Sequence, residues 1–308
     1  MAGNNHDHAH HGHTHAPPNN NAAFAIGVAL NAGFVIAEVV YGLAAHSLAL
    51  ISDAGHNLSD VFGLLIAWGA TYLAKTLPTK HRTYGWRRSS ILAALVNAIV
   101  LLIVVGGISV EAIRRIAHPE TVAGGKVMAV AAVGVIVNTV SALLFMAGRR
   151  RDLNIKGAFL HMASDAAVSL GVVLAGLAIR ATGWHWLDPA VSLAIGVVII
   201  VGTWGLLRES VNLSMDAVPS GIDPHAVESF LASLPEVNEV HDLHIWAMST
   251  TEVALTVHLM MAAPPRDDIF LHNLCRELQS RFGIGHATTQ IECGGAGTEC
   301  HQAAAHVV

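Results

Sequence analysis

The sequence predicts an all-α transmembrane bundle of six helices, followed by a small α+β domain. Of the 308 residues, 53% are hydrophobic and only 13% are charged, and the mean hydropathy is +0.51. A soluble domain has about 25% charged residues, so this deficit is too large for a soluble protein with one apolar patch. Long apolar stretches alternate with short polar breaks from Phe24 to Leu207, and the composition then becomes that of a soluble domain.

Residues 1–23 are predicted to form a disordered, His-rich tail. The stretch HDHAHHGHTHAPPNNN has no apolar periodicity and lacks the charged start and apolar core of a secretory signal peptide. His tracts of this kind suggest loose metal binding. A purely solvated tail and a cloning artefact are the alternatives.

Residues 24–207 are predicted to form the transmembrane domain. A spanning helix needs roughly 20 mostly apolar residues. Six segments qualify: 24–45, 48–74, 89–113, 126–148, 155–179 and 188–207. Several are rich in Gly, Ala and Ser, which lets helices approach closely in lipid. Segments such as ILAALVNAIVLLIVVGGISV have no charged face, which argues against a large soluble helical protein.

The basic residues predict the orientation of the bundle, because cytoplasmic loops carry an excess of Lys and Arg. One side holds ten of them: Lys75, Lys80, Arg82, Arg87, Arg88, Arg149, Arg150, Arg151, Lys156 and Arg208. The other side holds four: Arg114, Arg115, Lys126 and Arg180. We therefore expect the richer side, and with it both termini, to be cytoplasmic.

Residues 208–308 are predicted to form a cytoplasmic α+β domain for metal sensing or dimerisation. DPHAVESFLASL and PPRDDIFLHNLCRELQSRF have helical spacing, and EVHDLHIWAMS, EVALTVHLMM and HATTQIEC alternate like strands, with a turn at Ser249–Thr251. An α-β-β-α-β order of this length is α+β and too short for an enzyme with a buried cleft. The Gly-rich end is expected to be flexible.

Two spans repeat the same polar pair. His56 precedes Asp60 by four residues, and His161 precedes Asp165 by four. Residues four apart share one helix face, so two such helices can supply two imidazoles and two carboxylates to one point. An Asp at the centre of a span costs roughly 2.5–3.5 kcal/mol, and such residues usually mark an ion or proton path. The alternative is that each His-Asp pair only forms a hydrogen bond within its own helix. The occurrence of the same pair in two spans argues against this alternative.

The predicted ligand set favours zinc. Two imidazoles and two carboxylates suit the tetrahedral coordination of Zn²⁺, and mixed nitrogen and oxygen ligands also suit cobalt or cadmium. Magnesium and calcium prefer oxygen alone. Asp53 shares the face of His56 and Asp60. We expect it to be hydrated near the outer helix end, with a proton acceptor or a vestibule residue as the alternatives. Glu38, Asn31, Asn97 and Asn138 are expected to be packing or hydration groups.

LALISDAGHNLSD together with DLNIKGAFLHMASD resembles the cation diffusion facilitator family of zinc transporters. The span count, GWRRSSILAALVN and HDLHIW also match, so the resemblance extends from Phe24 through Glu292. It implies a homodimeric metal/proton antiporter with a ferredoxin-like cytoplasmic domain, and it maps the family's transport site onto His56, Asp60, His161 and Asp165. In this family the His-Asp plus His-Asp form goes with zinc preference, and an Asp in the first position with broader metal use.

The resemblance also implies metal binding in the soluble part, at or near the dimer contact. Its candidates are His241, His258, His272 and His286. Each of them taken alone is better interpreted as an exposed polar residue, whereas their local density favours at least one real site among them. His241 and His244 are three apart on a strand, so we expect them to face opposite sides. Glu292, Cys293, Cys300 and His301 are weaker candidates, and the three cysteines, which include Cys275, contain no CxxC pair and predict no disulfide framework.

We therefore expect an exporter that carries zinc, or cadmium or cobalt, out of the cytoplasm in exchange for protons by alternating access. Zn²⁺ would also be a regulatory ion, and we expect no catalytic cofactor, no enzymatic activity and no nucleic-acid partner. A metalloprotease would need HExxH and an ATP-driven pump GxxxxGK[ST], and the chain has neither. A membrane-anchored metal sensor is the other alternative. The expected location is a bacterial cytoplasmic membrane.

Overall fold

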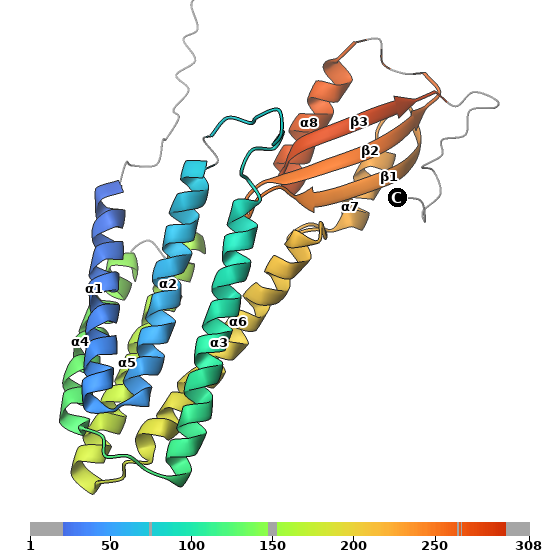
Figure 1. The fold of residues 1–308 in the computed structure, drawn as a ribbon. Helices are drawn as coiled ribbons and strands as arrows, with labels where there is room; N and C mark the ends of the chain where they lie inside the picture. Colours follow the sequence, from blue (N-terminus) through green and yellow to red (C-terminus); the bar gives the residue numbers. More distant parts are fainter. Residues whose placement is uncertain (1–20, 74–75, 147–152, 264, 266, 294–308) are drawn as a thin grey trace, which may run out of the picture.

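The computed structural model describes residues 21–73, 76–146, 153–263, 265 and 267–293. It shows a long helical bundle with a sheet domain beyond one end of it (Figure 1). The His tail through residue 20, Cys300 and His301 lie outside the described residues. Asn21, which the sequence assigns to the tail, is instead the first residue of the first helix.

Six helices form the bundle, with bounds close to the predicted spans. They are α1 (Asn21–Ala45), α2 (Leu48–Leu73), α3 (Ser89–Ala117), α4 (Gly124–Met146), α5 (Leu153–Thr182) and α6 (Leu187–Ser214). The last helix continues seven residues past the predicted end at 207. Leu213 in this extension packs with Ile91 of α3 and Ala247 of the sheet domain, so burial at the junction stabilises the additional turns.

The helices are apolar enough for lipid. Among the described residues, three helices could cross a membrane by length and composition: Ser89–Ala117, Ala163–Thr182 and Leu187–Ser214. The apolar parts of α1 and α4 within the described residues are shorter, at Asn31–Ala45 and Gly124–Val140. Large apolar side chains such as Ile103, Val110 and Val201 are more than 60% exposed, which suits contact with lipid rather than water.

Glycines allow the close contact between α4 and α5. A Cβ added to Gly176 would lie 2.9 Å from both the Gly124 carbonyl oxygen and the Met128 nitrogen. A Cβ on Gly124 would in turn lie 2.7 Å from the Gly176 carbonyl oxygen. The two backbones therefore touch directly, as is common where small residues meet in membrane helices.

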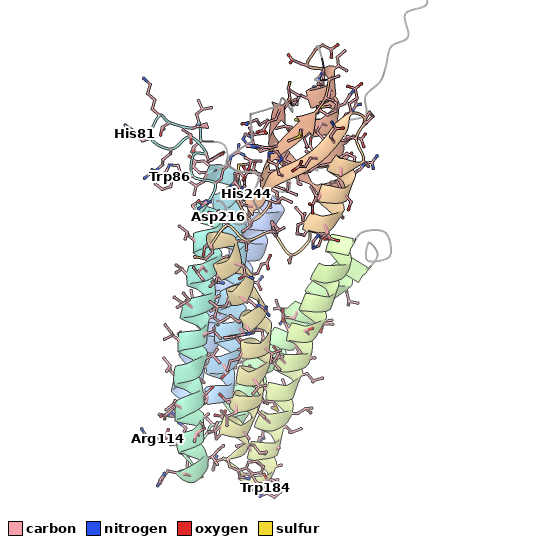
Figure 2. The ribbon with its side chains drawn as sticks, turned by 90° about the vertical axis from the view of Figure 1, so that its right-hand side faces the viewer. His81, Trp86, Arg114, Trp184, Asp216 and His244 are labelled. Carbon is pink, nitrogen blue, oxygen red and sulfur yellow. The ribbon has the colours of Figure 1, made fainter. Side chains whose placement is uncertain are left out.

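The bundle has two distinct ends. Arg114 and Trp184 lie at one end, whereas Trp86, Asp216 and His244 lie toward the sheet domain (Figure 2). At the end away from the sheet domain, the buried Asp188 of α6 accepts hydrogen bonds from the Ser47 hydroxyl, from Leu48 N at 2.6 Å and from Ala49 N at 3.4 Å. This carboxylate caps the first turn of α2 and ties it to α6, a role that the sequence analysis missed.

The sheet domain has the predicted α-β-β-α-β order: α7 (Pro224–Ala232), β1 (Val237–Ala247), β2 (Val253–Met261), α8 (Ile269–Phe282) and β3 (Ile284–Glu292). The small mixed sheet has the strand order β1-β2-β3, with β1 antiparallel and β3 parallel to β2. Asp223 caps α7 by accepting from His225 N, and Gly283 ends α8 with a φ of 72°. The helices cover one face of the sheet, around Leu231, Leu255 and Leu278.

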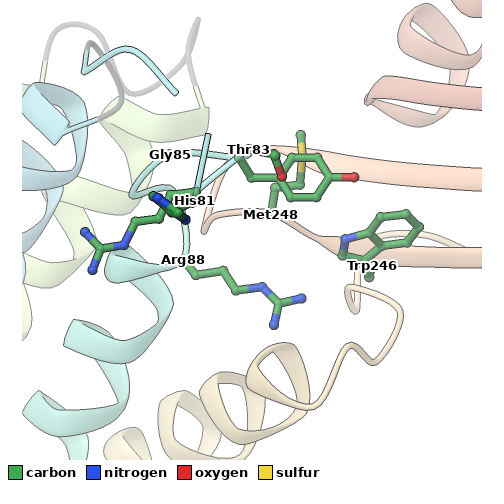
Figure 3. A pocket seen from close by; sticks show the side chains of 8 residues that line it. His81, Thr83, Gly85, Arg88, Trp246 and Met248 are labelled. Carbon is green, nitrogen blue, oxygen red and sulfur yellow. The ribbon is translucent and has the colours of Figure 1, made fainter. Parts of the chain in front are cut away.

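The segment between α2 and α3 meets the sheet domain. A cavity of about 310 Å³ opens there between residues 81–88 and the end of β1, lined by Arg88, Trp246 and Met248 among others (Figure 3). Arg88 pairs with Asp216, and Arg87 Nη1 lies 3.0 Å from Glu252 Oε1. These ion pairs tie the start of α3 to the sheet domain and to the segment that leads into it.

Candidate metal sites

The bundle brings together three of the four residues that the repeated His-Asp pairs predict. One ligand atom each of His56, Asp60 and Asp165 lies within 4.8 Å of the others. His56 Nε2 is 3.0 Å from Asp165 Oδ1, and Asp165 is only 2% exposed. The two helices α2 and α5 therefore direct one imidazole and two carboxylates to a common point.

The fourth predicted residue, His161, lies in α5 one turn before Asp165, and its side chain lies outside the described residues. The three described ligand atoms already form a mixed nitrogen and oxygen set with two carboxylates. Such a set can bind a divalent cation and offset its charge. Two carboxylates held close together within an apolar bundle, one buried and one partly buried, would be costly without a cation, so the arrangement favours cation binding.

Two more carboxyl groups are buried close to this cluster. Asp53 of α2 and Glu38 of α1 are both 0% exposed. The expectation that Asp53 is hydrated is therefore wrong, because α5 covers it and the Ser169 hydroxyl donates to its Oδ2 at 3.1 Å. Glu38, predicted to be a packing or hydration group, is buried, and its Oε2 accepts a hydrogen bond from Asn57 Nδ2 at 2.9 Å. The only indication in the sequence that these groups lie close to the metal site was the helix face that Asp53 and Asn57 share with His56.

A second cluster lies on the sheet of the soluble part. One ligand atom each of His241, His258 and Glu292 lies within 4.8 Å of the others. Glu292 bridges the two imidazoles, with His258 Nδ1 at 3.0 Å from its Oε1 and His241 Nε2 at 3.3 Å from its Oε2. His241 and His258 are directly paired across β1 and β2 and are only 8% and 7% exposed. Glu292, a weak candidate in the sequence, completes this group.

The expectation that His241 and His244 face opposite sides is wrong. His241 pairs with His258 and His244 with Thr256, so β1 has one extra residue between them, at a bulge where Asp242 has a φ of 52°. One extra residue returns His244 to the face of His241. His244 Nε2 nevertheless contacts Asp242 Oδ1 at 2.8 Å and is not part of the three-residue cluster.

The other two predicted histidines lie apart from this cluster. His272 is exposed on α8. His286 is exposed near the start of β3, where its ring lies 5.8 Å from that of Tyr84. It pairs with Ala254, four residues along β2 from His258. Within the described part of the protomer, the structure does not bring either one to His241.

Both parts of the chain match known protein families. Residues 24–213 match the cation efflux transmembrane domain, and residues 219–293 match the cytoplasmic domain of cation efflux proteins. The cation efflux system protein CzcD of Alcaligenes sp. strain CT14 is 40% identical over 92% of this chain and 90% of its own length. The zinc transporter ZitB of Escherichia coli K12 is 37% identical, over 94% and 95% respectively.

The name of a third relative describes an exchange reaction. The cadmium, cobalt and zinc/H(+)-K(+) antiporter of Bacillus velezensis is 33% identical over 92% of this chain and 91% of its own length. Both regions of the chain thus match, in order, and each relative aligns over nearly its whole length. The family consists of membrane metal transporters rather than enzymes, in agreement with the sequence analysis. The chain belongs to the cation efflux family.

Proposed function

We propose that the protein exports zinc from the cytoplasm across a bacterial cytoplasmic membrane in exchange for protons. The observation that carries this proposal is the cluster of His56, Asp60 and Asp165 between two helices of a cation efflux domain, in which Asp165 is buried and the other two are partly buried. With His161 as the fourth ligand, the site would have the two imidazoles and two carboxylates that suit Zn²⁺. The names of the relatives from Escherichia coli and Bacillus velezensis support zinc, and cadmium and cobalt are further substrates.

The proposed architecture has all six helices α1–α6 across the bilayer and both termini in the cytoplasm. The alternating course of the helices supports it, since α1 begins and α6 ends at the end of the bundle where the sheet domain lies (Figure 1). The excess of basic residues that the sequence assigns to the cytoplasmic side agrees with this orientation. The His-rich tail would then lie beside the cytoplasmic entrance, and the cytoplasmic domain would begin where α6 ends.

The exchange with protons follows from the chemistry of the ligands. Imidazole and carboxylate must be deprotonated to bind a metal, so protons compete with zinc for the site. A free imidazole titrates near pH 6.5, so a modest pH difference across the membrane changes occupancy. We propose that zinc binds from the cytoplasm, that the bundle then opens outward, and that protons displace the metal and return with the carrier.

The second cluster is proposed to bind regulatory zinc at the dimer contact. His241, His258 and Glu292 offer two imidazole nitrogens and a carboxylate, the donor set of a Zn²⁺ site with one open position. His272 and His286 are exposed, so in a homodimer their side chains remain available to bind a metal ion together with residues of the second copy. The match to the cytoplasmic domain of cation efflux proteins supports this role.

Zinc uptake into proteoliposomes tests the transport function. Asp60→Ala and Asp165→Ala are each expected to abolish zinc flux while the protein remains in the membrane, because each removes a ligand and leaves the remaining set incomplete. Ser52→Ala is the matched control: it removes the 2.7 Å hydrogen bond between Ser52 and Ser192 from the same bundle without touching a ligand. Normal flux in both Asp variants would contradict the assigned site.

The same vesicles test the exchange. Zinc flux through the wild-type protein is expected to rise when the compartment that receives zinc is made more acidic. Flux that is indifferent to an imposed pH gradient would contradict proton exchange. A membrane-anchored sensor, in contrast, would show no zinc flux in any condition.

A further inference from the structure

Glu38 and Asp53 form a buried pair of carboxyl groups that the metal site does not use. Each has one oxygen satisfied by a neutral donor: Asn57 Nδ2 donates to Glu38 Oε2 at 2.9 Å, and Ser169 Oγ donates to Asp53 Oδ2 at 3.1 Å. Both side chains are 0% exposed. Helices α1, α2 and α5 thus hold the two groups in fixed orientations away from water.

The other two oxygens lack a donor. Glu38 Oε1 and Asp53 Oδ1 are buried and have no hydrogen-bond partner among the described residues. The two carboxyl groups nevertheless lie within hydrogen-bonding reach of each other. An ionised carboxylate only accepts hydrogen bonds, and two ionised carboxylates side by side in an apolar interior repel each other. A single proton between the two groups satisfies both oxygens at once.

No fixed cation of the described chain can take the place of that proton. The ion pairs that Lys or Arg form within the described residues lie at the ends of the bundle or in the cytoplasmic domain. The titratable groups that act on Asp53 besides Glu38 are His56 of α2 and Asp165 of α5. The helix α4 presents no charge there: Gly134 lies against Ser169 and Phe34.

A metal ion fits this pair poorly. Calcium takes 6–8 oxygen ligands and magnesium an octahedral shell, whereas the pair offers two free oxygens. Asn57 and Ser169 direct a donor rather than an acceptor at the carboxyl groups. The chemistry of the site therefore matches a proton.

We propose that Glu38 and Asp53 form a proton-binding site that is separate from the metal ligands and holds one proton between Oε1 and Oδ1. Asp53 lies one helical turn before His56, so a divalent cation at the metal site favours the ionised pair. The pair then releases its proton as H⁺ and passes from one negative charge to two as the cation arrives. This coupling to zinc rests on the proposed exchange; the shared proton does not.

Infrared difference spectroscopy of the full-length protein in liposomes tests the shared proton. The wild-type protein at neutral pH is expected to show the carbonyl stretch of a protonated carboxyl group, and this band should disappear when zinc is added. Glu38→Gln and Asp53→Asn keep the size and neutrality of the protonated group and should each remove the zinc-sensitive band. Ser52→Ala, one residue from Asp53, should retain it.

Transport by the same variants tests the coupling. Glu38→Gln is expected to bind zinc but to lose the increase in zinc flux that a pH gradient produces in the wild type. A wild-type protein without the band, or a band unchanged in both variants, would overturn the proton site. If wild-type flux ignores the pH gradient while the band still disappears in the variants, the proposed exchange fails and the proton site stands. Absence of the band from the wild-type spectrum overturns the proton site by itself, whatever the yield of the variants, and the two variants assign a band that is present.

Discussion

At the scale of single residues, the contact between His56 and Asp165 joins positions 109 apart in the chain. Each residue alone is a costly polar group in an apolar helix, and the cost is offset when they share a cation. The identity of the cation then depends on the donor atoms. An imidazole nitrogen favours zinc and its neighbours in the transition series, whereas a carboxylate accepts a wider range of metals and coordination numbers.

The first prediction at this scale concerns selectivity. His56→Asp replaces a nitrogen donor with a carboxylate that can bind in one-oxygen or two-oxygen mode, which accommodates a larger ion. We expect transport to persist and the preference for zinc over cadmium to fall about tenfold, equivalent to about 1.4 kcal/mol. Parallel uptake of zinc, cadmium, cobalt and manganese in proteoliposomes measures this. An unchanged preference would show that His56 does not set the selectivity.

At the scale of elements, the bundle depends on how closely helices approach. The backbone contact between α4 and α5 leaves no room for a side chain at Gly176, whereas Gly171 on the same helix has nothing within 4 Å of an added Cβ. Because α5 carries Asp165, the position of the metal site depends on this contact. The two glycines therefore have different roles on one helix.

The second prediction compares these two glycines. Gly176→Ala places a Cβ 2.9 Å from backbone atoms of α4, so the helices must separate; we expect a loss of about 1–3 kcal/mol in stability and a weakened zinc site. Gly171→Ala should be neutral or slightly stabilising, because Ala favours a helix by about 1 kcal/mol over Gly. Thermal unfolding in detergent and zinc binding measure both. Equal effects of the two substitutions would show that the close contact between α4 and α5 does not require a glycine at position 176.

At the scale of the whole molecule, the cytoplasmic domain is attached to the bundle at two places. The chain itself passes from α6 through Asp216 to α7. In addition, the segment before α3 makes ion pairs, and Ser90 in the first turn of α3 accepts a 3.1 Å hydrogen bond from Thr250 N. A metal that pulls β1, β2 and the end of β3 together therefore acts on a domain held against α3 and α6. This arrangement suits regulation of the bundle by cytoplasmic zinc.

The third prediction concerns this domain. His258→Ala should remove one bound zinc per protomer in equilibrium dialysis, because the remaining two ligands hold the ion too weakly. His225→Ala, at an exposed histidine of α7, is the matched control and should leave the stoichiometry unchanged. Transport by His258→Ala is expected to persist with an altered dependence on cytoplasmic zinc. Full zinc content in His258→Ala would contradict the cytoplasmic site.

The sequence by itself determined the helical membrane region, the order of elements in the cytoplasmic domain and the two His-Asp pairs. Hydropathy, strand alternation and the four-residue spacing are all local properties, so they can be read along the chain without knowing how distant segments meet. The family resemblance added the assignment of those pairs to a transport site. The helix ends were predicted less accurately: α6 continues to Ser214 because its last turns pack with α3 and the sheet domain.

Only the tertiary structure decided which residues complete the sites. Glu292 joins His241 and His258 because β3 lies parallel to β2, and His244 shares their face because of a one-residue bulge. Asp53 is buried because α5 covers it, and Glu38 of α1 lies beside it. Burial and pairing of this kind depend on the packing of segments far apart in the chain, and no local pattern of residues contains that information.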